Sequence, residues 1–185
     1  MGLWACGPSS SEVSGAKTAH YKGDKAAMFE AAKAAVADKY KIDKSDVNEL
    51  GIQTTARWYT PEGLAAAGDG QDMRQVPNRS LSIAFVVTLR ADGDAFIAVV
   101  KPLMIRYVAG SPQPQPISED DPSVPGWATG KVDALALAVH DALKQWEVQT
   151  LPGTAGAPAA PAPAPASDGT APAAPAPAPA PAPAQ

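Results

Sequence analysis

RSLSIAFVVTLRADGDAFIAVVKPLMIRYVAG, residues 79–110, is the stretch of sequence that decides the fold. From Leu81 to Leu89 apolar residues alternate with smaller or polar ones, which is typical of a β-strand with one buried face. The run ends at Asp92-Gly93, and Asp-Gly between two apolar runs is typical of a two-residue hairpin turn. We therefore predict an antiparallel hairpin with its loop at Asp92 and Gly93. The predicted facing pairs are Leu89 with Phe96, Val87 with Ala98 and Phe85 with Val100.

The second half of this hairpin changes phase. After Val100 the large apolar residues are Leu103, Ile105 and Tyr107, and Lys101-Pro102 stands at the break. A slip of one residue at a proline is typical of a β-bulge, since proline donates no hydrogen bond to a ladder. We predict a bulge or strand break at Lys101-Pro102.

The acidic residues of the turn do not predict a metal site. Asp92 and Asp94 offer carboxylates, but calcium takes about six or more oxygen ligands and no further donors are suitably spaced. An ordinary turn is the simpler interpretation.

Composition excludes several function classes. The chain has 185 residues, of which 45% are hydrophobic and 18% charged, with a formal net charge of −4. This is enough for one domain with a hydrophobic core, and the absence of a Lys/Arg cluster argues against nucleic acid as a partner. Cys6 is the single cysteine, so an intramolecular disulfide and a cysteine-based zinc site are excluded. No apolar run approaches the ~20 residues of a membrane span.

Two amphipathic helices flank the β-rich centre. The first is predicted over residues 25–40 with Asp24 as its N-cap, and the second over residues 129–149 with Thr129 as a candidate cap. Between the first helix and the hairpin, residues 42–50 are turn-rich and residues 52–59 alternate as a strand. Residues 62–78 read as a long connection.

The segment before the second helix, residues 111–126, is rich in proline and therefore predicts an extended strap over the surface. Its acids Glu119, Asp120 and Asp121 offer a site for a cation or a basic partner, although a solvated loop is the commoner case. Trp127 is interpreted as a packing residue and His140 as a surface histidine.

The N-terminus resembles that of bacterial lipoproteins. Leu3-Trp4-Ala5-Cys6 is similar to the lipobox, whose cysteine is lipidated and becomes the mature N-terminus, and the small polar residues after it resemble a flexible tether. Trp4 departs from the pattern, and the basic and apolar parts of a signal peptide are missing, as a start codon assigned too far downstream would explain. The resemblance implies lipidation at Cys6, envelope proteins as partners, and a periplasm-facing anchor. Gly7 is compatible with outer-membrane sorting; without an upstream signal the protein is cytoplasmic.

The C-terminal residues 151–185 are nearly all alanine and proline, which predicts a disordered spacer of polyproline II type. We therefore divide the chain into an N-terminus with tether at 1–21, a domain at 22–150 and the tail at 151–185. The predicted domain is an α+β two-layer sandwich, in which an antiparallel sheet of three to four strands carries two helices on one face. This order of elements loosely resembles helix-grip and related envelope-assembly accessory lipoproteins, without a shared motif.

Two functions fit this architecture. The first is a non-enzymatic envelope lipoprotein with an accessory or scaffolding role, whose sheet exposes a face or an edge to other proteins. The second is a domain that binds a small apolar ligand, such as a lipid, between the sheet and the last helix. No catalytic motif, metal site or cofactor site is recognised, so an enzyme is not predicted. The predicted lining of the apolar cavity is Phe85, Phe96, Ile105 and Trp146.

Overall fold

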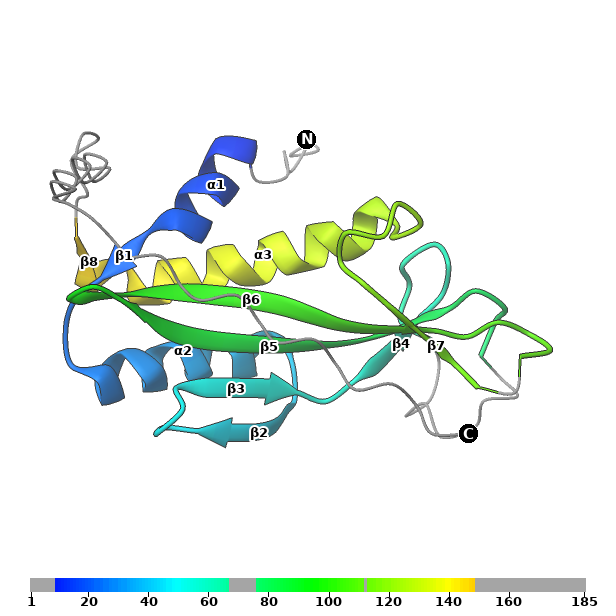
Figure 1. The fold of residues 1–185 in the computed structure, drawn as a ribbon, viewed down its shortest axis with the longest axis horizontal. Helices are drawn as coiled ribbons and strands as arrows, with labels where there is room; N and C mark the ends of the chain where they lie inside the picture. Colours follow the sequence, from blue (N-terminus) through cyan, green and yellow to red (C-terminus); the bar gives the residue numbers. More distant parts are fainter. Residues whose placement is uncertain (1–8, 67–75, 112, 149–185) are drawn as a thin grey trace, which may run out of the picture. The chain divides into compact units, whose positions relative to one another are not determined.

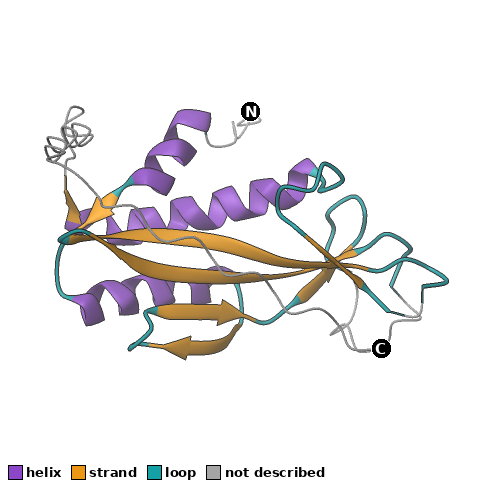
Figure 2. Ribbon diagram, viewed as in Figure 1, coloured by secondary structure: helices purple, strands orange, loops and turns teal. Residues whose placement is uncertain are grey.

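The computed structural model describes residues 9–66, 76–111 and 113–148 (Figure 1). The chain divides into two units, Met1–Thr150 and Leu151–Gln185, and all of the described residues belong to the first. This unit is an α+β structure built on one antiparallel sheet (Figure 2). Its described part has eight strands and three α-helices, more strands than the three to four predicted.

The strands and helices have the following bounds. The strands are β1 (His20–Tyr21), β2 (Ile42–Asp46), β3 (Gly51–Thr54), β4 (Arg57–Tyr59), β5 (Leu81–Asp92), β6 (Ala95–Arg106), β7 (Gln115–Ile117) and β8 (Glu147–Val148). The helices are α1 (Ser10–Thr18), α2 (Lys25–Lys39) and α3 (Gly126–Leu143), followed by a short 3-10 helix (Lys144–Trp146). The strand order is β2-β3-β5-β6-β1-β8, with β4 beside β5 and β7 beside β6.

The hairpin of β5 and β6 is the centre of the sheet, as predicted, but its register differs. Asp92 pairs with Ala95, so the loop is Gly93-Asp94, and Leu89 faces Ala98 instead of Phe96. Gly93 has a φ of +63°. A glycine at the first central position suits the type II′ turn, which needs positive φ there alone, whereas the predicted Asp-Gly loop assumed a type I′ turn.

The predicted bulge at Lys101-Pro102 is wrong. β6 pairs with β5 without interruption from Ala95 to Arg106, and Pro102 stands opposite Phe85. The Phe85 N–H donates to the Thr54 hydroxyl at 2.8 Å, on the side of β5 that faces away from β6. Since paired antiparallel residues turn their polar groups either both toward or both away from each other, Pro102 also turns its backbone away from β5. The missing proline N–H therefore costs the ladder nothing.

The hydrophobic core lies between the hairpin and the helices. The predicted inward face of β5 is confirmed, because its five odd-numbered apolar residues are each at most 4% exposed. Helices α2 and α3 contact each other, and α3 runs along β6 (Figure 1). The Asp24 side chain caps α2 as predicted, accepting a hydrogen bond from the Ala27 N–H at 2.8 Å. The core residues from the two helices are Met28, Phe29, Ala32, Val36, Ala128, Leu135, Val139 and Leu143.

Several boundaries differ from the sequence predictions. Residues 10–21, expected as a flexible tether, form α1 and β1; the capping box of Ser9 and Glu12 starts the helix, and Tyr21 is fully buried. β2 lies where turns were expected, and being an exposed edge strand it needs no apolar alternation. The predicted strand 52–59 is divided into β3 and β4, both paired with β5. Helix α3 begins at Gly126, before the expected Thr129.

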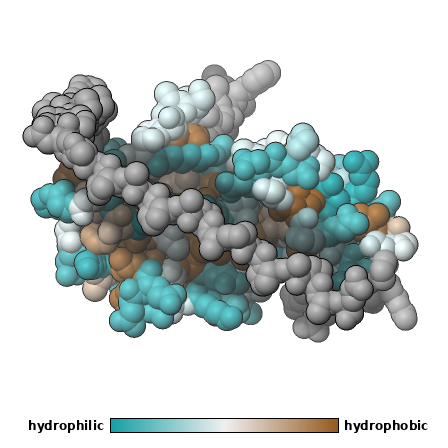
Figure 3. All heavy atoms as spheres, in the orientation of Figure 1, coloured by the Kyte–Doolittle hydropathy of each residue, from teal (hydrophilic) through white to brown (hydrophobic). Residues whose placement is uncertain are grey.

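In the space-filling view, hydrophobic residues show between the more hydrophilic surfaces of the helices and of β2 (Figure 3). None of the described helices is long and apolar enough to cross a membrane.

Candidate functional site

The outer edge of β6, the edge away from β5, has a gap in its pairing. β1 pairs with this edge at Phe96 and Ile97, and β7 pairs with it from Met104 to Arg106. Between them no strand of the described chain pairs with residues 98–103. At about 3.3 Å per residue the gap leaves room for roughly 20 Å of extended chain. We call this stretch the open edge.

Backbone polar groups face outward along the open edge. Pro102 turns its carbonyl away from β5, as argued above, and because orientation alternates along a strand, Val100 turns both its N–H and its C=O the same way. Within residues 9–66, 76–111 and 113–148, no hydrogen bond is recorded for these three groups. Unpaired donors and acceptors at a sheet edge are a template for pairing with another chain.

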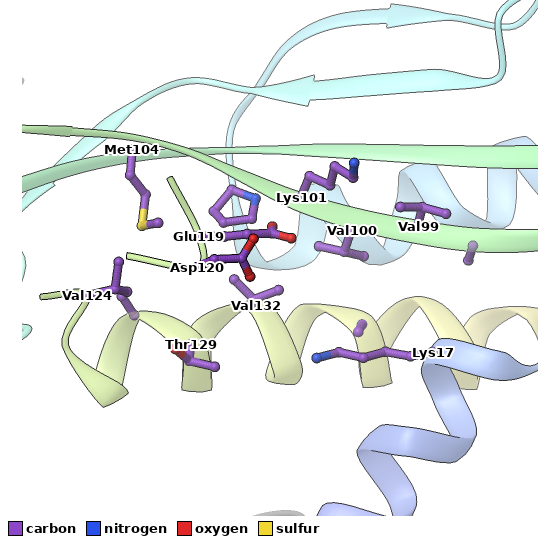
Figure 4. Close-up of a pocket in the computed structure, with 14 residues that line it drawn as sticks. Lys17, Val99, Val100, Lys101, Met104, Glu119, Asp120, Val124, Thr129 and Val132 are labelled. Atoms are coloured by element: carbon purple, nitrogen blue, oxygen red, sulfur yellow. The ribbon is translucent and has the colours of Figure 1, made fainter. Parts of the chain in front are cut away.

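A cavity of about 380 Å³ lies beside the open edge. Its walls are β6 and α3, and Figure 4 shows Val100 on the strand and Val132 on the helix bordering the same space. Its lining is mainly apolar near the strand and the helix. The residues that line it are Lys17, Ala98, Val99, Val100, Lys101, Pro102, Met104, Glu119, Asp120, Val124, Ala128, Thr129, Val132 and Ala136.

The two ends of this cavity carry opposite charges. Lys17 of α1 borders it, and its ammonium group lies 2.7 Å from a carboxylate oxygen of Asp133. Glu119 and Asp120 follow β7 and border it away from Lys17 (Figure 4). Both acids are exposed, and no salt bridge to either is recorded among the described residues. Two carboxylates thus stand at the β7 end of the open edge without a salt bridge to a described residue, and Lys101 is the second cation among the lining residues.

The loop that carries these acids is fixed by hydrogen bonds of the residues that follow them, Asp121 and Ser123. Asp121 accepts a hydrogen bond from the Ser123 N–H at 2.8 Å and another from the Ser123 hydroxyl, and these bonds lower the pKa of the Asp121 carboxyl. Arg106 of β6 donates to the Ser123 carbonyl at 2.9 Å and to its hydroxyl at 3.0 Å. The loop is therefore tied to the end of β6, and Glu119 and Asp120 keep their place beside the cavity.

The four residues predicted to line an apolar cavity do not come together. Phe85 is 1% exposed in the core, whereas Ile105 lies on the opposite face of the sheet and is 38% exposed. Phe96 packs at the margin of the core, and Trp146 lies against Gly23 at the end of α3. The prediction assumed the bulge; without it, even-numbered residues of β6 face the helices and Ile105 faces away. Neither of the two described pockets is lined by any of the four.

The titratable groups elsewhere hold elements together. The Tyr21 hydroxyl lies 2.9 Å from His140 Nδ1 and joins β1 to α3; burial, with Glu147 and Asp141 nearby, raises the pKa of Tyr21. The carboxylates of the hairpin turn face β1. Asp92 lies 2.9 Å from His20, and Asp94 lies 2.6 Å from Lys22, which lowers the pKa of Asp94.

These contacts leave no metal centre in the described chain. Among its residues no group of three or more His, Cys, Asp or Glu side chains is placed to hold a metal ion. Cys6, the part of the long connection at 67–75 and the Ala/Pro tail lie outside the described residues.

One residue in the sequence, Pro102, already indicated an open edge, although we interpreted it as a sign of a bulge. Proline inside a strand is found at bulges or on edge strands whose missing donor faces outward. Pro102 belongs to the second class, because β1 and β7 leave that side of β6 uncovered.

No family model matches the chain, and no curated protein matches it.

Proposed function

We propose that this chain is a non-enzymatic binding protein that holds an extended segment of another protein on the open edge of β6. The observation that carries the proposal is the set of outward-facing backbone groups of Val100 and Pro102 beside the cavity along α3. Addition of a strand to a sheet edge draws affinity from main-chain hydrogen bonds and specificity from pockets for alternate side chains. The open edge offers the hydrogen bonds, and the cavity between β6 and α3, which we call the groove, offers such a pocket.

The neighbouring strands limit what can bind. β1 and β7 already pair with the same edge of β6, one at either end of the open edge, so a long edge strand of a folded domain would collide with them. The same collision excludes pairing of β6 with β6 of a second copy. A short extended segment, whose flanking residues turn away from β6, fits the gap of roughly 20 Å. The proposed partner is therefore a short linear motif, and the lipobox-like Leu3-Trp4-Ala5-Cys6 leads us to propose that it belongs to an envelope protein.

Val100→Pro tests this function. Proline there removes one outward donor but leaves the ladder to β5 intact, as at Pro102. Peptides are selected from a displayed library of random eight-residue sequences on the full-length chain, and their dissociation constants are measured by fluorescence anisotropy. We expect Val100→Pro to raise the dissociation constants of the selected peptides at least about tenfold, because a hydrogen bond is lost and the proline ring occupies space beside β6 that the peptide backbone needs.

Val100→Thr is the matched control, because it keeps the N–H and nearly the same shape; its loss of affinity, which comes only from the added hydroxyl, should be much smaller than that of Val100→Pro. A thermal melt checks that both variants are folded. Selected peptides that bind Val100→Pro as tightly as the unmodified chain would refute the proposal, and so would a library that yields no binder.

A second candidate function is a site for a small apolar ligand. The cavity of about 380 Å³ between β6 and α3 falls in the usual size range of ligand sites, and Val100, Met104 and Val132 give it an apolar wall. It lies between the sheet and the last helix. A fluorescent fatty acid that binds the full chain and is not displaced by the selected peptides would favour this candidate.

We further propose that the protein is held in the cell envelope, facing the periplasm, by lipid at Cys6, where it has an accessory or scaffolding role. The support is the lipobox-like Leu3-Trp4-Ala5-Cys6 and the polar residues that follow it. Expressed from its own locus in the source cells, the protein should enter the membrane fraction and carry acyl chains by intact mass. Cys6→Ser should release it. A free thiol in a fully soluble protein would contradict the anchor.

A further inference from the structure

We infer that the bound segment runs antiparallel to β6 and carries a basic residue at its N-terminal end, followed by apolar residues at alternate positions. This inference rests on the function proposed above and adds the direction and chemistry of the partner. It follows from the strands beside the gap, from the lining of the groove and from the charges at its ends.

The direction of the bound segment follows from the two strands that flank the open edge. β1 and β7, the two strands beside the gap, are both antiparallel to β6. Within an antiparallel pair one partner residue exchanges both hydrogen bonds with Val100, whereas parallel bonds are slanted and slightly less stable. Pro102 contributes its carbonyl alone and accepts one further bond. An antiparallel segment therefore uses all three of these groups of Val100 and Pro102, and Ala98, two residues before Val100, turns its polar groups the same way.

The alternation of side chains follows from the same pairing. Residues directly opposite each other in a sheet point to the same face, so the segment residues opposite Val100 and Pro102 point toward α3. There they meet Val132 and the small residues Ala128 and Ala136. The residue between them stands opposite Lys101 and points to the other face, where Leu103, which is 52% exposed, is its diagonal neighbour. Two apolar side chains separated by one unrestricted position match this groove.

The charge preference follows from the direction. An antiparallel segment enters at the β7 end, where Glu119 and Asp120 border the cavity without a recorded cation, and leaves toward Lys17. Lys17 already lies 2.7 Å from Asp133, whereas neither acid forms a salt bridge with a described residue. Lys101, the other cation that lines the cavity, stands at an odd position of β6, whose side chains point away from α3. A lysine or arginine just before the paired residues is complementary to these two carboxylates.

Two labelled peptides with the same composition in opposite order test the inference. Acetyl-Lys-Lys-Val-Thr-Val-Thr-Gly-amide places its charges at the entry, and the reversed sequence acetyl-Gly-Thr-Val-Thr-Val-Lys-Lys-amide places them at the exit. Against the full-length chain in low salt, we expect the first to bind about three- to tenfold tighter by fluorescence anisotropy, a difference that shrinks at high salt because exposed charges are screened.

The double variant Glu119→Lys/Asp120→Lys should abolish this preference for basic residues first. Glu49→Lys, at an exposed acid away from the groove, is the matched control and should leave the preference unchanged. Equal binding of the two peptides, sensitive to Val100→Pro, would overturn the direction and charge while leaving the proposed function standing. A preference that survives in the double variant would overturn the role of the two acids. Failure of every peptide, library-selected ones included, would overturn both.

Discussion

Replacing Phe85 with alanine is expected to lower the free energy of unfolding by about 3–5 kcal/mol. The side chain is 1% exposed and lies in the middle of β5, facing the helices. Its ring centroid is 4.7 Å from that of Tyr40, at an interplanar angle of 47°. Strands on both sides of β5 and the helices above it limit how far the structure can close the cavity that alanine leaves, so the cost should approach the upper part of the range.

Ile105→Ala is the matched control. Both residues were predicted from the sequence to line one apolar cavity, but Ile105 is 38% exposed on the other face of the sheet. Its truncation removes partly solvated surface, and we expect a loss of less than about 1.5 kcal/mol. Urea unfolding followed by circular dichroism measures both values. Equal losses for the two variants would show that Ile105 faces the core and that the register of β6 is wrong.

Lys101→Pro is expected to cost about 2–4 kcal/mol of unfolding free energy, although Lys101 is an exposed side chain next to a natural proline. Lys101 pairs with Val86 and turns its N–H toward β5. Proline there removes a hydrogen bond from the centre of the longest pairing in the sheet and leaves the Val86 carbonyl without its donor. The pyrrolidine ring also meets β5 directly.

The comparison with Val100→Pro, one residue earlier, makes this prediction specific. That variant places the missing donor on the open edge and should cost less than about 2 kcal/mol, much of it from the lost valine side chain. Thermal melts of the Lys101→Pro and Val100→Pro proteins, together with the hydrogen-exchange rate of the Val86 amide, distinguish the loss of a donor to β5 from the loss of a donor on the open edge. If Val100→Pro proved the more destabilising of the two, the assignment of the outward side of β6 would be reversed.

The sequence by itself determined those features that depend on neighbouring residues. Alternation with a period of two marked the buried face of β5 from Leu81 to Leu89, because successive side chains of a strand point to opposite faces. Helix α2 was likewise predicted with its cap, since the Asp24 side chain bonds a backbone group three residues away. The α+β class followed from these elements.

Beyond the pairing of the hairpin strands, only the tertiary structure decided which strands meet. β1 and β7 are too short to show any periodicity; both pair with the edge of β6, and β1 pairs with β8 as well. The register of the hairpin depended on whether the turn glycine takes the first or the second central position, a choice that the letters Asp-Gly-Asp leave open. Whether Pro102 marked a bulge or an edge depended in turn on what lies beside β6.

The candidate site belongs to this second group. Its backbone groups are those of ordinary residues, Val100 and Pro102, and no side-chain motif identifies them. They become a site because β1 and β7, which are far apart in the sequence, stop short of each other along one edge, and because α3 runs beside the gap. Such a gap is a relation between segments distant in the chain, and local patterns of residues do not encode it.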